Sequence, residues 1–132
     1  MSAAGRFLDL AGRVLVAALF WWSAIFGVAL DWQGTVGFVM SKGLPLPELV
    51  AAGTGAFEIL APVALFHRRL AGWAALALAG FCLATAGIFH DWWAYAGGAR
   101  ANQTAHFMKN VALAGALLAL ATGALRNGAG RD

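Results

Sequence analysis

Long apolar runs separated by short polar stretches dominate the chain. Four runs stand out, over Val14–Leu30, Leu49–Phe66, Leu70–Phe89 and Val111–Leu125. Only the second contains a charged residue, Glu58. A helix that spans a bilayer needs about 20 mostly apolar residues. The pattern therefore predicts four membrane-spanning helices, at about residues 10–30, 48–66, 70–90 and 105–125.

The polar stretches between the runs are typical of connectors. Lys42–Pro47 holds two prolines and a glycine, and Pro47 suits the first turn of the helix that follows. His67–Arg69 predicts a tight turn, and Asp91–Gln103 predicts a longer polar loop with a Gly-Gly pair. These lengths predict helices joined by short loops, as in a compact bundle.

Composition excludes a soluble protein. The chain of 132 residues is 61% hydrophobic and 11% charged, whereas soluble domains average about 45–50% apolar and about 25% charged. The charged residues are too few to cover the surface of a small soluble domain. The composition therefore also excludes a disordered chain and a nucleic-acid-binding module. We expect a single all-α domain over residues 1–132, an integral membrane four-helix bundle. Its abundant glycine and alanine let helices approach closely in lipid.

The distribution of basic residues predicts how the chain lies in the membrane. Six of the nine lie near the two ends of the chain and in the second connector, namely Arg6, Arg13, Arg68, Arg69, Arg126 and Arg131, against Lys42, Arg100 and Lys109 on the other side. Cytoplasmic segments carry the excess of Lys and Arg. Both termini are therefore expected in the cytoplasm. We interpret the first run as a retained helix, because tryptophans at 21, 22 and 32 distinguish it from a cleaved signal peptide.

The single cysteine, Cys82, lies inside an apolar run. One thiol cannot form a disulfide or a CxxC pair within the chain. The sequence thus excludes dithiol chemistry within this protein and favours a small buried side chain at this position.

Glu58 is the most informative polar residue. Helical rise from Pro47 places it about 16 Å along the second span, near the centre of a bilayer. A charge there costs at least about 2.5–3.5 kcal/mol, so the carboxyl is expected to face the bundle interior. Trp22 and Ser23 reach a similar depth on the first span, and both carry hydrogen-bond donors. A protonated, purely structural carboxyl is the alternative to a functional one.

The fourth apolar run is too short to span alone, so its helix is expected to begin near Ala105. This brings His106, Lys109 and Asn110 onto one face of its first turns. Lys109 either extends outward to water or reaches toward Glu58. His90, at the end of the third span, is expected near His106. The two histidines and Asp91 can bind a metal or relay protons, and the histidines can ligate haem or simply form hydrogen bonds; we assign no metal site.

Together these residues predict a polar pocket that opens to the outer side of the membrane. Its members are Glu58, Lys109, Asn110, His106, His90, Trp22 and Ser23. Cationic and amide donors, aromatic walls and titratable groups suit a quinone head group. The same groups would alternatively hold four short helices in register. Residue types alone name no catalytic group and leave open whether the protein is an enzyme.

Several strings resemble the DoxX family of small four-span bacterial inner-membrane proteins. They comprise Gly34-Thr35-Val36, Lys42-Gly43-Leu44-Pro45-Leu46-Pro47-Glu48-Leu49, Glu58, Arg69, Phe89-His90-Asp91-Trp92-Trp93, Gln103, and His106-Phe107-Met108-Lys109-Asn110-Val111-Ala112-Leu113-Ala114-Gly115. Many members have a Ser-Gly pair followed closely by a lysine in the first span. Here Ala24 follows Ser23, and Gly27 stands about where that lysine would be.

The resemblance implies a multi-pass protein of the bacterial cytoplasmic membrane. The family takes its name from a subunit of an archaeal thiosulfate:quinone oxidoreductase, and other members look like partners of membrane redox complexes. We therefore expect a quinone-associated or redox-partner membrane component without a covalent cofactor and with the pocket open to the periplasm. Alternatives are a non-catalytic assembly subunit of a larger membrane complex and a small transporter. Expected partners are the lipid bilayer and other membrane subunits or a second copy, and not nucleic acid.

Overall fold

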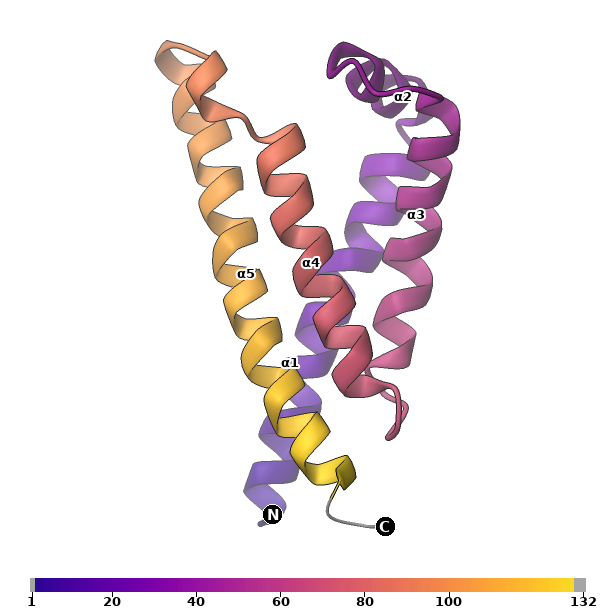
Figure 1. Ribbon diagram of the computed structural model, residues 1–132, viewed down its shortest axis with the longest axis vertical. Coiled ribbons are helices and arrows are strands. Elements are labelled where there is room, and N and C mark those ends of the chain that lie inside the picture. Colours follow the sequence, from indigo (N-terminus) through magenta and orange to yellow (C-terminus); the bar gives the residue numbers. More distant parts are fainter. Residues whose placement is uncertain (1, 130–132) are drawn as a thin grey trace. The chain divides into compact units, whose positions relative to one another are not determined.

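The chain is mostly helical in the part that the computed structural model describes, which is residues 2–129 and the side chains of residues 2–126. The elements in order are α1 (Ala3–Trp22), the π-helix η1 (Ser23–Ala29), α2 (Trp32–Ser41), α3 (Pro47–Ala64), α4 (Ala71–Phe89), the 3-10 turn η2 (Trp92–Ala94) and α5 (Gly97–Ala129) (Figure 1). The predicted all-α class is confirmed.

Three helical segments among the described residues are long and apolar enough to cross a membrane. They are Ala3–Ala29, Ala71–Ala94 and Gly97–Arg126. The helix α3, at the second predicted span, is not one of them, and it carries Glu48, Glu58 and two prolines. An all-α membrane protein is thus confirmed. The count of four spans and the cytoplasmic location of both termini stay predictions.

Contacts divide the chain into two compact units, Met1–His67 and Arg68–Asp132, called unit 1 and unit 2 below. Each unit is described by itself. The expectation of one domain over the whole chain stays a prediction.

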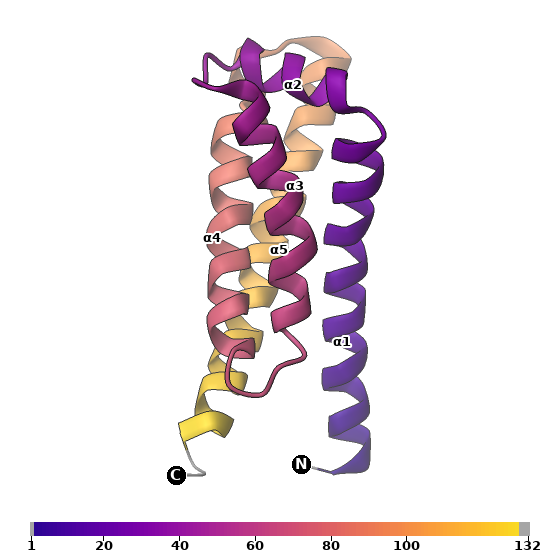
Figure 2. The same cartoon turned by 90° about the vertical axis from the view of Figure 1, so that its right-hand side faces the viewer.

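In unit 1, α3 packs against α1 and η1, and α2 lies near the end where η1 stops and α3 begins (Figure 2). The buried positions of α1 and η1 recur every three or four residues, which forms one apolar stripe along the helix. These positions are Ala17, Phe20, Ala24 and Val28, and α3 contributes Ala51, Gly55, Glu58 and Pro62. Among the described residues, Glu58 is therefore a buried ionisable side chain in a core that otherwise consists of apolar and small residues.

The first helix is longer than predicted and changes its geometry. It begins at Ala3, because the Ser2 hydroxyl accepts a hydrogen bond from the backbone N–H of Gly5 and caps the first turn. From Ser23 to Ala29 the hydrogen bonding changes to the wider π pattern, as in the bond from Leu30 N–H to the Ile25 carbonyl. Such segments are rare and occur often at functional sites.

The segment after the first span forms a helix that the apolar pattern does not predict. Residues Trp32–Ser41 are helical, and Val36 and Val39 turn into the core of unit 1. The connector ends at Leu46, whose φ of 51° is left-handed, and α3 then begins with Pro47 in its first turn. The predicted role of Pro47 is confirmed.

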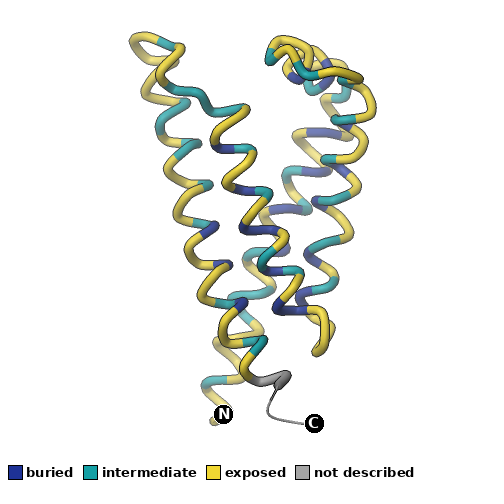
Figure 3. Tube along the Cα trace, viewed as in Figure 1, coloured by how far each residue is buried: buried dark blue, intermediate teal, exposed yellow. Residues whose placement is uncertain are grey.

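Unit 2 is a hairpin of α4 and α5, which run side by side in opposite directions and are joined through η2 (Figure 1). Buried positions of α4 recur at helical spacing (Figure 3), and most are small: Ala71, Gly72, Ala75, Leu78, Ala79, Cys82 and Ala86. A Cβ built on Gly72 would lie 2.6 Å from the Leu125 side chain, so the helices approach closely there. Cys82 is buried, as its position predicts.

The last helix begins at Gly97, ahead of the expected start near Ala105. Gly97 has a φ of 55°, a conformation that glycine adopts without steric cost, and this turns the chain into α5. The predicted loop Asp91–Gln103 therefore shortens to η2 and a few flanking residues.

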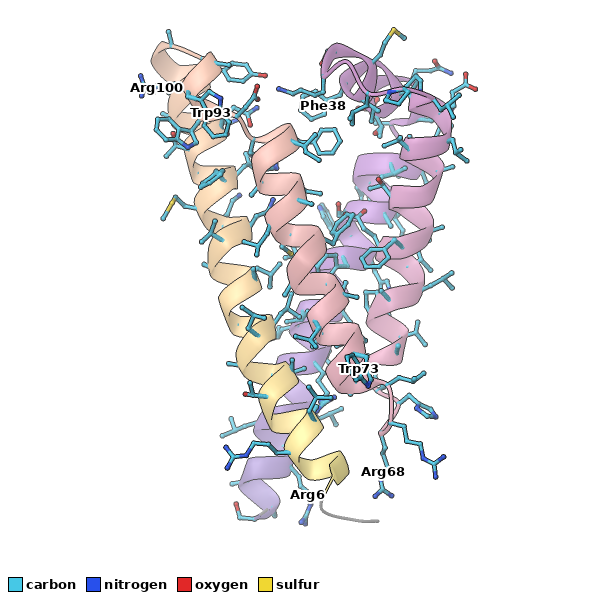
Figure 4. The ribbon with its side chains drawn as sticks, viewed as in Figure 1. Arg6, Phe38, Arg68, Trp73, Trp93 and Arg100 are labelled. Atoms are coloured by element: carbon cyan, nitrogen blue, oxygen red, sulfur yellow. The ribbon has the colours of Figure 1, made fainter. Side chains whose placement is uncertain are left out.

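Aromatic and basic side chains mark the two ends of unit 2. Trp93 and Arg100 lie at one end of the hairpin, and Arg68 and Trp73 lie at the other (Figure 4). The 19 residues of α4 between these ends rise about 28 Å, close to the thickness of about 30 Å of a hydrocarbon core. Tryptophans at both ends of such a span suit the two membrane interfaces.

Candidate functional site

Glu58 is the polar group at the centre of unit 1. Its side chain is 6% exposed. One carboxylate oxygen, Oε1, accepts a hydrogen bond of 2.9 Å from the Ser23 hydroxyl. The other, Oε2, is buried without a hydrogen-bond partner among the described residues. Ser23 is the first residue of η1, so the change of helical geometry begins at the residue that holds Glu58.

The two adjacent tryptophans of α1 have different surroundings. Trp22 is 62% exposed, and its ring stacks on Phe26 with centroids 4.0 Å apart. The indole N–H of Trp21 instead donates a hydrogen bond of 3.1 Å to the backbone carbonyl of Ile59, beside Glu58 in α3. Trp21 is therefore the tryptophan whose indole nitrogen binds α3, whereas the sequence pointed to Trp22.

In unit 2, two histidines come together where α4 and α5 are joined. The rings of His90 and His106 stack with centroids 5.1 Å apart. The Nδ1 of His90 donates to the side-chain carbonyl of Gln103, at 2.9 Å. In a neutral ring this leaves Nε2 of His90 as an acceptor. Gln103 and His106 lie one turn apart on α5.

Asn110 extends the same face of α5 by one more turn. Its side-chain NH₂ donates to the Thr85 hydroxyl of α4 at 3.4 Å, a long hydrogen bond. The Thr85 hydroxyl itself donates to backbone carbonyls of its own helix. Lys109 is exposed, whereas His106 and Asn110, with which the sequence groups it, are half-buried. His90, Gln103, His106 and Asn110 are called the hairpin polar face below.

Aromatic rings gather at the joined end of the hairpin, the same end as His90 and His106. Trp93 contacts Phe107 edge to face with centroids 6.2 Å apart, and it contacts Trp92 in the same way at 5.8 Å. The Arg100 guanidinium lies 5.0 Å from the Trp92 ring. Rings next to polar donors and acceptors make a surface that suits a flat, partly polar molecule.

The seven residues predicted to line one pocket thus fall into two sets. Ser23, Trp22 and Glu58 belong to unit 1, and His90, His106, Lys109 and Asn110 belong to unit 2. One pocket formed by both sets stays a prediction. The sequence analysis assigns Trp21, Thr85 and Gln103 to no pocket. The i, i+3 spacing of Gln103 and His106 nevertheless indicates that these two side chains share a face of the helix.

No group of three or more His, Cys, Asp or Glu side chains that could hold a metal ion occurs among the described residues.

Comparisons with known proteins agree with the resemblance drawn from the motifs. The sequence profile of the DoxX family matches residues 8–91. The inner membrane protein YphA of Escherichia coli (strain K12) is 34% identical over 126 residues, which covers 91% of this chain and 85% of that protein. No solved structure matches. The profile match includes Glu58 and His90 and ends before α5, whereas the similarity to YphA extends over most of the chain.

Proposed function

Because this chain belongs to the DoxX family and is a multi-pass inner-membrane protein, we propose that it associates with a quinone and serves as a redox-partner component of the membrane. The quinone head group binds at the hairpin polar face of unit 2. The predicted orientation of the chain places this end of the hairpin on the periplasmic side.

One observation carries the proposal: the hairpin polar face holds both kinds of hydrogen-bonding group that a quinone and its reduced form need. A quinone carbonyl accepts hydrogen bonds, and the second N–H of Asn110 and a ring N–H of His106 can donate them. A quinol hydroxyl donates, and Nε2 of His90 accepts when Nδ1 is held by Gln103. These donors and this acceptor therefore fit both the quinone and the quinol.

The aromatic rings support the same assignment. A quinone ring is flat and mostly apolar, and Trp93 and Phe107 pack edge to face at the same end of the hairpin. The end of a membrane-spanning hairpin is also where a lipid-soluble quinone can place its head group while its tail stays in the hydrocarbon.

Electrons must come from another protein in this proposal. The single cysteine, Cys82, is buried in α4 and has no second thiol in the chain with which to form a dithiol pair. The protein would bind and orient the quinone, and a redox partner would supply or remove the electrons.

The proposal is tested by binding. The full-length protein is purified in mild detergent, its extract is analysed for quinone, and a short-chain ubiquinone is titrated while tryptophan fluorescence is followed. We expect His106→Ala to weaken binding by about tenfold, the loss of roughly one hydrogen bond. His67→Ala is the matched control, because His67 lies in a turn outside the hairpin polar face. Absence of quinone from the extract together with equal affinities for both variants would contradict the proposal.

An assembly subunit without quinone binding is the second candidate. Four exposed glycines favour it, since a Cβ at Gly80, Gly87, Gly115 or Gly123 would contact nothing within 4 Å in the described structure. Small residues at such positions let another helix approach. Mild-detergent purification that yields a stoichiometric partner or a defined oligomer, with no quinone, would favour this candidate.

A further inference from the structure

The Glu58 carboxyl has one oxygen without a hydrogen-bond donor, and this observation does not depend on quinone binding. The side chain is more than nine-tenths buried, and Oε2 has no hydrogen-bond partner among the described residues. Ser23 supplies one donor, to Oε1 only. Buried polar atoms are nearly always paired, so an orphaned carboxylate oxygen points to a partner that the described residues of unit 1 do not provide.

The backbone near Glu58 lacks one of its usual donors. Pro62 lies one turn further along α3 and has no N–H, so it cannot donate to the Glu58 carbonyl as an ordinary helical residue would. One turn before Glu58, a Cβ built on Gly55 would lie 3.1 Å from a methyl carbon of Val28. The junction between η1 and α3 is therefore close-packed at Gly55 and Val28, and the nearby Trp21 indole N–H is already bonded to the Ile59 carbonyl.

No charged side chain of the elements packed on α3 neutralises Glu58. Neither η1 nor α2 contains a titratable residue. In α1 the charged residues are Arg6, Asp9 and Arg13. The Arg13 guanidinium pairs with Asp9 and donates to the carbonyl of Leu65, which lies about 10 Å along the chain from Glu58. Arg6 lies a further two turns toward the N-terminus.

From these contacts we propose that Glu58 and Ser23 form a binding site for a small monovalent cation, either a proton or a sodium ion, at the junction of η1 and α3. A proton bonds to Oε2 directly and removes the charge. A sodium ion is held by Oε2 with the Ser23 oxygen and the Glu58 backbone carbonyl, which are the hard oxygen ligands that it prefers. Binding and release leave the redox state of the protein unchanged.

The test uses the reactivity of a protonated carboxyl toward dicyclohexylcarbodiimide in the full-length protein. The carboxyl proton passes to a nitrogen of the reagent, the carboxylate oxygen adds to its central carbon, and the O-acylisourea rearranges to a stable N-acylurea. This lipid-soluble reagent reaches buried carboxyls. The exposed Glu48 on the same helix is the internal control, labelled by a water-soluble carbodiimide.

For a proton site we expect peptide mass spectrometry to find the label on Glu58, decreasing by about tenfold for each pH unit on the alkaline side of its midpoint. Ser23→Ala retains the label and carries more of it at each pH, because the ionised carboxylate has lost its one hydrogen bond. This variant keeps the test valid if Glu58→Gln, which removes the label, fails to fold.

The two cations are distinguished by salt. Sodium chloride that suppresses labelling, where choline chloride of equal ionic strength does not, identifies a sodium site. Equal labelling in both salts identifies a proton site. Absence of label on Glu58 at every pH and in both salts, while Glu48 reacts normally, would overturn the proposal. Quinone titration of Ser23→Ala remains unchanged if only the cation site is affected, so the two proposals fail separately.

Discussion

The two units differ in where they place their polar groups relative to their closest helix packing. In unit 1, the contact between Gly55 and Val28 lies one turn from Glu58, so the buried carboxyl belongs to a close-packed junction. In unit 2, the closest approach is at Gly72 and Leu125, and the His90–Gln103 pair lies at the opposite end of α4.

This difference predicts in which unit helix packing and polar side-chain chemistry can change independently. Sites that share no contacts and lie far apart contribute additively to stability, whereas neighbours couple. Packing and polar chemistry should therefore separate in unit 2 and should couple in unit 1.

The largest effect is expected from Gly72→Ala. The added Cβ would lie 2.6 Å from two carbons of Leu125 and 3.3 Å from its backbone nitrogen, so both helices must shift. We expect a loss of about 2–3 kcal/mol of unfolding free energy from overpacking. Thermal unfolding in detergent measures it, with Gly80→Ala as a control at an open position of the same helix. A quinone affinity that fell together with stability would break the proposed separation.

Gly55→Ala is expected to cost less, about 1 kcal/mol, because its Cβ meets only a methyl carbon of Val28 at 3.1 Å. The more informative effect of this variant is on the carbodiimide labelling of Glu58. A shift between η1 and α3 moves Ser23 relative to Glu58, so carbodiimide labelling of Glu58 should change together with the melting temperature. Unchanged labelling in a destabilised variant would show that packing and polar chemistry are independent in unit 1 as well.

Gln103→Ala tests how the hairpin polar face is held. The variant removes the acceptor for Nδ1 of His90, a half-buried hydrogen bond worth about 0.5–1.5 kcal/mol. We expect a small loss of stability and a clear change in the ring ¹⁵N chemical shifts of His90, which report the tautomer. Shifts that stay the same would mean that Gln103 does not set the tautomer of His90.

The smallest change in stability is expected from Glu58→Gln, within about 0.5 kcal/mol. The amide oxygen keeps the hydrogen bond from Ser23, and the amide group takes the place of a carboxylate oxygen that has no hydrogen-bond partner among the described residues. Chemical denaturation of the two proteins in parallel measures the difference. A loss comparable to that of Gly72→Ala would mean that the carboxylate has a partner which an amide cannot replace.

Much of the polar arrangement follows from counting along the sequence. Equal depth on neighbouring spans places Ser23 beside Glu58, and the structure contains that hydrogen bond. A short connection between two spans places His90 near His106, and their rings stack. These relations depend on helical rise and connector length, which the positions of apolar and polar residues determine.

Other features of the structure could not be predicted from positions along the sequence. Trp21 and Trp22 are adjacent, and about 100° of rotation around α1 separates them, so only the packing on α3 decides which indole donates to Ile59. The π-helix at Ser23–Ala29 and the helix α2 leave no mark in the apolar pattern. The early start of α5 depends on the conformation of Gly97.

By itself, the sequence determined the helical class, the membrane location, the family and the presence of one acid in an apolar run. These follow from composition, run length and motif, which are properties of the chain before it packs. Tertiary structure decided that one oxygen of Glu58 is satisfied and the other is not, and that Gln103 orients His90. Hydrogen bonds between helices need atoms within about 3 Å of each other, and only the rotation and approach of packed helices fix distances on that scale.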